Sequence, residues 1–339
     1  MLKTKRIGNV VRSYLKNYGR VIAALSLALS ALCCATQVSA EEWPQRPVRF
    51  FLPFGPGSAA DTAARVIGED LAVRWGKPVV VENRPGADGL IAINGFVTAK
   101  DDHVLLLTST GTFLAHPYVH KKLDYNLDRD LAPIGRIADT LLVVGVPKTL
   151  KAGDLKQFVE LARAQPDLNL AASPGLTEFA VDAFLKKEDL KTVRVPYKEL
   201  AGAARDLSEG RIHFLLTSYA VVRPFVEAGK VKIIAAGTSQ RSPLTKDIPS
   251  ISESGYPMLA AETSTVIFGG PQMPPALRKK IADDMIAALK EPKVRDRVAL
   301  TGQDILPTGP DELAALVKQQ IKKTDTIAAS LGMKKATDN

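Results

Sequence analysis

Short apolar runs alternate with segments of helical periodicity along most of the chain, beginning with the run 48–52. A turn rich in proline and glycine follows at 53–57, and apolar residues then recur at helical spacing over 63–71. This pattern predicts a buried strand, a glycine turn and a helix that begins near Ser58. Because such a turn leaves backbone N–H groups at the positive end of the helix dipole, it is suited to bind an anion.

The same strand and helix pattern recurs along the chain. Further strands are predicted at 79–81, 104–107, 141–146, 168–172, 193–196, 212–216, 231–236 and 264–268. Further helices are predicted at 90–100, 155–164, 179–185, 203–208, 221–228, 276–289, 294–300 and 310–330. Strands that alternate with helices favour a mainly parallel, helix-covered sheet, and the strand at 79–81 is expected to be buried.

Two domains account for this order of elements. One arrangement returns the last quarter of the chain to the first domain, so that domain 1 comprises 41–141 and 262–339 and domain 2 comprises 142–261. Two strands, near 141–146 and 263–268, then form the hinge between the domains.

The first forty residues have the pattern of an export signal. Six positive residues come first, without an acidic residue before Glu41, and are followed by an apolar run at 21–32. That run is short for a bilayer span, and 38–40 have the small residues of a signal-peptidase site. The pattern predicts a signal peptide, residues 1–40, that is cleaved after Ala40. The alternative is an uncleaved membrane anchor.

Removal of this segment changes the charge and the cysteine content. The formal net charge of +9 falls to +3 without the six positive residues of the signal, so the basic balance does not indicate nucleic-acid binding. Both cysteines, Cys33 and Cys34, also lie in the signal. The exported chain therefore has no disulfide and no thiolate chemistry.

A dinucleotide-dependent oxidoreductase is one alternative, because residues 55–60 fit the pattern G-x-G-x-x-A between a strand and a helix, and Glu82 ends the next strand. Against it, Pro56 lacks an N–H group that would hold a pyrophosphate, and Glu82 continues into a loop at 83–86. An exported protein also meets little free nicotinamide cofactor.

A hydrolase is a second enzymatic alternative, but the chain has no G-x-S-x-G motif. Its four histidines are His103, His116, His120 and His213. His116 and His120 are four residues apart, but no glutamate follows His116 and Pro117 makes a helix doubtful, so zinc is not indicated. We expect these histidines at the surface or in turns, and no catalytic residue is assigned.

Small polar segments follow strands in both halves, at 55–61, 109–112, 173–177 and 217–218. In parallel α/β folds the loops at the carboxyl ends of strands line the ligand crevice. Such residues are also ordinary helix caps and turns. Taken together, they favour a cleft that binds a small polar anion through neutral hydrogen-bond donors.

Several longer motifs resemble one known family. They are Trp43–Arg49, Pro53–Gly57 with Asp61, Val79–Ala87, Val195–Lys198, Gln240–Pro243 and Ile248–Gly255. In these motifs the chain resembles the Bug family of extracytoplasmic solute receptors, the binding component of tripartite tricarboxylate transporters. The resemblance covers 43–335, and the run Glu82–Ala87 is its most specific part.

The resemblance implies an α/β protein with the type II periplasmic-binding-protein fold, in which two lobes are joined by two hinge strands. It implies a periplasmic solute-binding protein, not an enzyme, without cofactor or metal. Its partners are then a small organic carboxylate and either the membrane permease subunits of a tripartite tricarboxylate transporter or a sensor ectodomain. No nucleic-acid partner is implied, and a monomer is expected.

The resemblance also implies the residues that hold the ligand. They are Gly57, Ser58, Ala59 and Asp61 in the first loop, Thr110 and Thr112 in the second, Ser173, Gly175 and Thr177 in the facing loop, and Tyr197 and Thr217. Asp61 lies in the first turn of a helix, where its spacing suggests that it caps backbone N–H groups.

The chain departs from the family pattern at a few positions. His213, Thr217 and Glu199 replace residues usual in the family, and the connection 100–103 is shortened. Because Thr217 stands where relatives often carry an acid, we expect a mono- or dicarboxylate without an amino group. These departures leave the ligand unnamed and keep a sensor-only receptor as an alternative.

Overall fold

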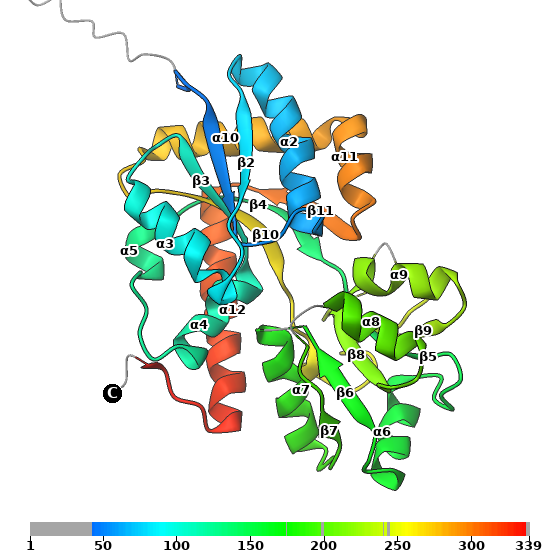
Figure 1. Cartoon of the computed structure of the whole chain (residues 1–339). Coiled ribbons are helices and arrows are strands. Elements are labelled where there is room, and N and C mark those ends of the chain that lie inside the picture. Colours follow the sequence, from blue (N-terminus) through cyan, green and yellow to red (C-terminus); the bar gives the residue numbers. More distant parts are fainter. Residues whose placement is uncertain (1–42, 174, 198–199, 240, 243–244, 337–339) are drawn as a thin grey trace, which may run out of the picture. The chain divides into compact units, whose positions relative to one another are not determined.

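The structure is a computed structural model that describes residues 43–173, 175–197, 200–239, 241–242 and 245–336 (Figure 1). The predicted signal peptide lies outside this part of the chain, as do Lys198 and Glu199. Within the described ranges no helix is both long and apolar enough to cross a membrane. The strands form two separate sheets.

The first sheet has six strands in the order β11-β4-β10-β3-β1-β2. Their bounds are β1 (Val48–Leu52), β2 (Val79–Asn83), β3 (Val104–Ser109), β4 (Ala132–Thr140), β10 (Ser264–Gly269) and β11 (Gln303–Thr308). β1 pairs in parallel with β2 and β3. β10 is antiparallel to β3 and β4, and β11 is antiparallel to β4.

The second sheet has five strands in the order β7-β6-β8-β5-β9. Their bounds are β5 (Leu142–Pro147), β6 (Asn169–Ala172), β7 (Val193–Arg194), β8 (Phe214–Ser218) and β9 (Val231–Ala236). β6 pairs in parallel with β7 and β8, whereas β5 is antiparallel to β8 and β9.

Both sheets are mixed, so the expectation of a mainly parallel sheet is wrong. A parallel pair needs a crossover connection, usually a helix, between its strands. Here β4 leads directly into β5 of the other sheet, with Leu141 alone between them, and the chain re-enters the first sheet as β10. The strands that carry the chain between the sheets therefore run antiparallel to their neighbours.

Two further expectations about strands need correction. β2 is not buried, because it lies at the edge of its sheet and Val80 is 43% exposed. β4 and β11 were not predicted, although β4 has nine residues. Gly135, Arg136 and Asp139 interrupt its apolar pattern, and its pairing with β10 and β11 depends on residues distant in sequence.

Helices connect most of the strands. In the first part of the chain they are α2 (Ala59–Trp75), η1 (Ala87–Gly89), α3 (Leu90–Ala99), α4 (Thr110–Val119) and α5 (Leu127–Asp130). The middle part contains α6 (Leu155–Ala164), α7 (Leu176–Lys187), α8 (Leu200–Ser208), α9 (Tyr219–Glu227) and η3 (Pro257–Leu259). The last part contains α10 (Pro275–Lys290), α11 (Pro292–Ala299) and α12 (Pro310–Leu331). The bounds of α6 and β9 agree with the predicted ranges.

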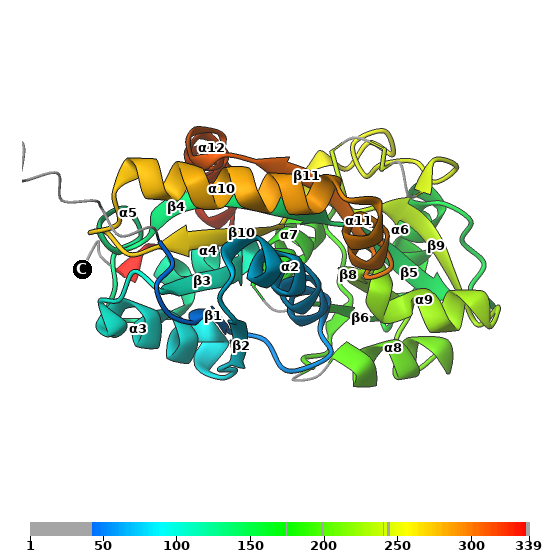
Figure 2. The same ribbon diagram turned by 90° about the horizontal axis from the view of Figure 1, so that it is seen from above.

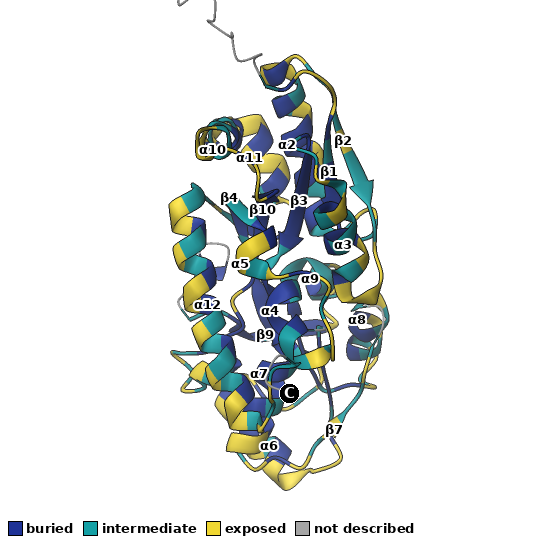
Figure 3. Cartoon of the chain, turned by 90° about the vertical axis from the view of Figure 1, so that its left-hand side faces the viewer, coloured by how far each residue is buried: buried dark blue, intermediate teal, exposed yellow. Residues whose placement is uncertain are grey.

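The apolar runs of central strands such as β3 and β8 are buried on both faces. In β8, Phe214 and Leu216 belong to a cluster with α6 and α7, whereas Leu215 belongs to a cluster with α8 and α9. Successive residues of a strand point to opposite faces, so a sheet covered on both sides needs a continuous apolar run. Figure 3 shows the same for β3, whose residues are mostly buried.

The last three helices pack against the first sheet or its helices, and one of them also contacts a helix beside the second sheet. α10 lies along β4 and β11, and α11 continues beside α2 (Figure 2). α12 packs against β4 and α4, and also against α7, the helix that follows β6 of the second sheet (Figure 1). The two passages of the chain between the sheets are joined by a hydrogen bond from the Thr140 N–H to the Thr263 carbonyl, 2.8 Å long.

Candidate functional site

Four helices begin at the ends of strands: α2 follows β1, α4 follows β3, α7 follows β6, and α9 follows β8. Thr110 directly follows β3, so the expected loop at 109–112 is largely the first turn of α4. The expected loop at 217–218 is the end of β8, and α9 begins directly after it at Tyr219. The first N–H groups of a helix have no partner within it, and the helix dipole places partial positive charge there. Two helix starts from each sheet therefore supply neutral donors for an anion.

The turn between β1 and α2 is fixed by Ser58 and Asp61. The Ser58 hydroxyl caps α2 by accepting the N–H of Asp61 at 3.2 Å. The Asp61 carboxylate accepts the N–H of Gly57 at 2.9 Å, so the predicted capping role of Asp61 is confirmed. Gly57 has a φ of 81°, which favours glycine, and Ala59 is half-buried.

Asp61 has further partners. Its carboxylate also accepts hydrogen bonds from the Arg65 guanidinium at 3.1 Å and from the Asn83 side-chain amide at 2.8 Å. Burial by itself would raise the pKa of Asp61, but the hydrogen bonds from Arg65, Asn83 and Gly57 outweigh it and hold the pKa below its usual value. Asp61 is therefore an anion whose acceptor capacity is used within the protein.

Thr110 and Thr112 lie in the first turn of α4. Thr110 is fully buried, and its hydroxyl accepts the N–H of Ser264 in β10 at 3.0 Å. Its side chain therefore joins α4 to the strand that returns from the second sheet. Thr112 is half-buried, and its methyl group would lie 2.8 Å from a β-carbon at Gly89.

In the segment 173–177 after β6, hydroxyl groups form hydrogen bonds within the protein. The hydroxyls of Ser173 and Thr217 are 2.9 Å apart and join the ends of β6 and β8. The Thr177 hydroxyl donates to the carbonyl of Ser173. Thr217 is fully buried and neutral, and its hydroxyl is already bonded to that of Ser173.

Tyr197 is engaged elsewhere. Its hydroxyl donates to the Asp206 carboxylate at 2.6 Å, and its ring would contact a β-carbon at Gly202. Burial and then the hydrogen bond to Asp206 raise the pKa of Tyr197 to about 12. The donor of Tyr197 is thus already used.

A cavity of about 420 Å³ borders the first turn of α2. Its lining residues come from α2 and the turn before it, from the start of α9, and from α11 and the turn after it: Gly57, Ala59, Thr62, Val66, Ala220, Arg297, Leu300 and Thr301. Gly57 and Ala59 were predicted, whereas sequence reasoning missed Ala220 and Arg297. The Arg297 guanidinium pairs with the Glu69 carboxylate at 2.6 Å. No local sequence pattern indicates that Arg297, in a partly exposed helix, lies beside α2.

The carboxylate of Glu82, considered above for ribose binding, is also occupied. It lies 3.4 Å from the Arg49 guanidinium and 2.8 Å from that of Arg84. The Arg84 guanidinium in turn stacks over the Phe51 ring, 3.5 Å from its centroid. Glu82 and Arg84 therefore brace β1 and β2.

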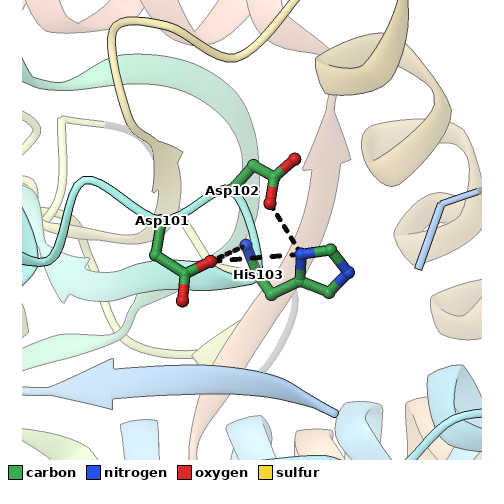
Figure 4. Close-up of side chains that lie close together, drawn as sticks. All are labelled: Asp101, Asp102 and His103. Carbon is green, nitrogen blue, oxygen red and sulfur yellow. Dashed lines mark hydrogen bonds and ion pairs between the residues drawn. The ribbon is translucent and has the colours of Figure 1, made fainter. Parts of the chain in front are cut away.

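Asp101, Asp102 and His103 form a cluster in the turn before β3 (Figure 4). The His103 Nδ1 lies 2.6 Å from the Asp102 carboxylate, and the His103 backbone N–H donates to Asp101 at 2.8 Å. Arg46 pairs with the Asp101 carboxylate at 2.6 Å, which supplies the positive charge that a cation would bring. We describe the cluster as an ion-pair network.

His103 lies in a turn, as expected, although it is buried. His116 differs from expectation, because it is buried in a helix rather than at the surface or in a turn. His116 lies inside α4 despite the following Pro117. Its two ring nitrogens lie 2.7 Å from the Tyr125 hydroxyl and 2.9 Å from the Asp88 carbonyl. Burial lowers the pKa of His116, so its neutral form is favoured in the fold.

The chain is similar to several known proteins over nearly its whole described length. Protein BugT from Bordetella pertussis is 26% identical over 323 residues, which cover 94% of this chain and 99% of BugT. The solved structure of the periplasmic binding protein BugD is 26% identical with a TM-score of 0.73, covering 86% of this chain and 99% of BugD. MatC from Rhodopseudomonas palustris with bound malate is 26% identical with a TM-score of 0.72, covering 84% and 99%.

These structural neighbours are periplasmic binding proteins with two lobes, and the strands of this chain likewise form two sheets. A family model described as the tripartite tricarboxylate transporter family receptor matches residues 63–333. The match includes α2 from Ala63 onward, the ends of β3, β6 and β8, and the cavity residues of α11, whereas the first turn of α2 lies just before it. The chain therefore belongs to the tripartite tricarboxylate transporter receptor family, as its resemblance to Bug proteins implied.

Proposed function

We propose that the protein captures a small organic carboxylate in the periplasm and delivers it to the permease subunits of a tripartite tricarboxylate transporter. The observation that carries the proposal is the cavity bordered by the first turn of α2 and by Ala220 at the start of α9. Its lining residues come from both lobes, and the family is one of receptors. MatC, a structural neighbour, holds malate.

Neutral donors suffice for such a ligand. A hydrogen bond to a charged group contributes roughly 1.5–3 kcal/mol, so three or four of them approach the roughly 8 kcal/mol that micromolar affinity requires. Part of this gain is offset by the loss of motional freedom on binding. Arg297 adds a positive charge at the edge of the cavity, although it is shared with Glu69.

The ligand is proposed to lack an amino group. An ammonium buried in the site would require a carboxylate or several carbonyl groups around it. The cavity lining contains no acidic residue, and the Asp61 carboxylate already accepts hydrogen bonds from Gly57, Arg65 and Asn83. Thr217 is neutral and bonded to Ser173. Malate, adipate and similar acids are therefore favoured over aspartate and glutamate.

We further propose that the export signal is removed after Ala40 and that the protein acts as a monomer without a cofactor. Residues 41–141 with 262–339, and residues 142–261, move as two lobes about the passages at Leu141 and Thr263. Closure of the lobes around the ligand then presents the loaded receptor to the permease. N-terminal sequencing of the exported protein tests the cleavage site, with Glu41 as the expected first residue.

Titration of the exported protein with two sets of acids tests the ligand class. We expect calorimetry and thermal unfolding to show binding and stabilisation by malate or adipate, and none by aspartate or glutamate. Stabilisation by an amino acid and by no plain acid would contradict the argument from Asp61 and Thr217. Uptake by cells with and without the gene, at low concentrations of the bound acid, separates transport from sensing.

Enzymatic activity is not part of the proposal. The family is one of receptors, and the Glu82 carboxylate that a dinucleotide enzyme would need is paired with Arg49 and Arg84. Incubation of the bound acid with the protein, followed by mass spectrometry, should return the acid unchanged.

A further inference from the structure

We propose that Asp61 and Asn83 are positioning residues that hold the turn between β1 and α2 so that the N–H groups of Ala59 and Ala60 face the ligand. This inference rests on the proposed carboxylate site. It removes Asp61 and the N–H of Gly57 from the ligand contacts implied by the family resemblance, and it adds Asn83, which sequence reasoning did not include.

The middle of this turn, residues 55–57, lacks support from packing. A β-carbon built at Gly55 or at Gly57 would meet no atom within 4 Å, and Pro56 and Gly57 are exposed. In such a segment the backbone geometry depends on hydrogen bonds, because no neighbouring side chains restrict it. The hydrogen bonds to this turn therefore decide where the first N–H groups of α2 point.

Asp61 supplies the first of these bonds. Its carboxylate is 3% exposed and accepts the Gly57 N–H at 2.9 Å, which closes the turn onto the start of α2. The N–H of Asp61 donates to the Ser58 hydroxyl, and the N–H of Thr62 donates to the Ser58 carbonyl at 2.9 Å. Of the first four N–H groups of α2, those of Ala59 and Ala60 are thus left for a ligand, and Ala59 borders the cavity.

Asn83 connects this arrangement to the sheet. Its side-chain amide donates to the Phe54 carbonyl at 2.9 Å and to the Asp61 carboxylate at 2.8 Å. Its side-chain oxygen accepts from the Arg65 guanidinium at 2.9 Å. Because Asn83 ends β2, which pairs with β1 residue by residue up to Leu52, the turn is attached at both its start and its end.

Nuclear magnetic resonance of the exported chain, residues 41–339, tests the internal bonds without a ligand. The Gly57 amide proton should shift with pH as Asp61 titrates, with a midpoint below 3.8. In Asp61→Asn this titration should vanish. In Asn83→Ala, which keeps the carboxylate, the Gly57, Ala59 and Ala60 amide signals should move. Unchanged Gly57 signals in a folded Asp61→Asn protein would overturn the proposal.

Malate and adipate then test the consequence for binding. Addition of the bound acid to the wild-type protein should shift the Ala59 and Ala60 amide signals. Both variants should bind that acid about tenfold more weakly, with unchanged stoichiometry. Wild-type affinity in both variants would overturn the positioning role. Absence of any acid-induced shift in the wild-type protein would instead overturn the proposed function, and the pH titration of Gly57 would still decide the internal bond.

Asp130→Asn is the matched control. Asp130 is also buried, its carboxylate accepts the N–H of the residue four positions before it, Asn126, at 2.8 Å, and it pairs with Arg129. This network lies in α5, away from the residues that line the cavity. The control should lose stability as Asp61→Asn does, but its affinity for the acid and its Ala59 signal should stay as in the wild-type protein.

Discussion

Gly175, at the start of α7, lies against the backbone of Gly111 in α4, so closely that a β-carbon at residue 175 would be 2.9 Å from the Gly111 carbonyl oxygen. The contact joins two of the segments assigned to ligand binding, one from each sheet. Gly175 has φ 89° and ψ −135°, a conformation that side-chain-bearing residues avoid. Glycine is required here for both reasons.

Gly175→Ala should therefore weaken the contact between the two lobes. Backbone strain contributes roughly 1–3 kcal/mol, and the contact with the Gly111 carbonyl adds to it. We expect a lower free energy of unfolding in urea and a larger radius of gyration in solution scattering.

Gly229→Ala is the control for the effect of backbone strain alone. Gly229 has a φ of 68°, but a β-carbon there would meet no atom within 4 Å. This variant should lose roughly 1 kcal/mol and keep the wild-type radius of gyration. An equal radius in Gly175→Ala and Gly229→Ala would contradict the role assigned to the Gly111 contact.

His116 should make stability depend on pH in mildly acidic solution. Its folded pKa lies below the ordinary value of 6.5, because the ring is buried. Below pH 6.5 the unfolded chain therefore binds a proton that the folded chain does not, and stability falls as the pH falls toward the folded pKa. The slope approaches about 1.4 kcal/mol per pH unit.

His116→Gln removes this titrating group while keeping a donor and an acceptor for Asp88 and Tyr125. Urea unfolding at pH 7.5, 6.5 and 5.5 compares the two proteins. The difference between their free energies of unfolding should change below pH 6.5 and stay constant above it. A constant difference over the whole range would contradict this prediction, because it would mean that His116 binds a proton equally well in the folded and the unfolded chain.

Local signals predicted the elements that neighbouring residues stabilise. Ser58 and Asp61 are three positions apart, the spacing of a helix cap, and the structure confirms that the Ser58 hydroxyl accepts the Asp61 N–H. The amphipathic pattern of 155–164 likewise predicts α6 with its observed bounds. In both cases the stabilising contacts lie within a few residues or one helical face.

Contacts distant in sequence explain what could not be predicted. Asn83 lies 22 residues from Asp61, and its role depends on the pairing of β2 with β1. β4 is a strand because β10 and β11 pair with it. Burial of His116 depends on Tyr125 and on the backbone of Asp88, 28 residues away. Periodicity in a single segment contains none of this information.

Phe179 should contribute to the contact between the lobes as well as to stability. Its ring packs edge-on against Tyr118 with centroids 6.0 Å apart, and it belongs to the same buried cluster as residues of α4 and α12. Phe179→Ala should lose roughly 3–5 kcal/mol and increase the radius of gyration. Phe184→Ala, in the cluster of the second sheet, should lose a similar amount without that increase. Equal scattering of the two variants would contradict this assignment.

The hydroxyl pair of Ser173 and Thr217 should behave as a coupled unit. Thr217→Val keeps the shape of the buried side chain but leaves the Ser173 hydroxyl without this partner, at a cost of roughly 1–3 kcal/mol. Ser173→Ala should cost a similar amount, because it leaves the Thr217 hydroxyl unpaired.

The double variant removes both polar groups at once, so its cost should be smaller than the sum of the single costs. Urea unfolding of the four proteins gives the coupling free energy, which we expect to be roughly 1 kcal/mol. Strict additivity would mean that each hydroxyl finds another partner when its neighbour is removed. In that case Ser173 and Thr217 would be independent residues at the ends of β6 and β8, and the Thr217 hydroxyl would be free to bind a ligand.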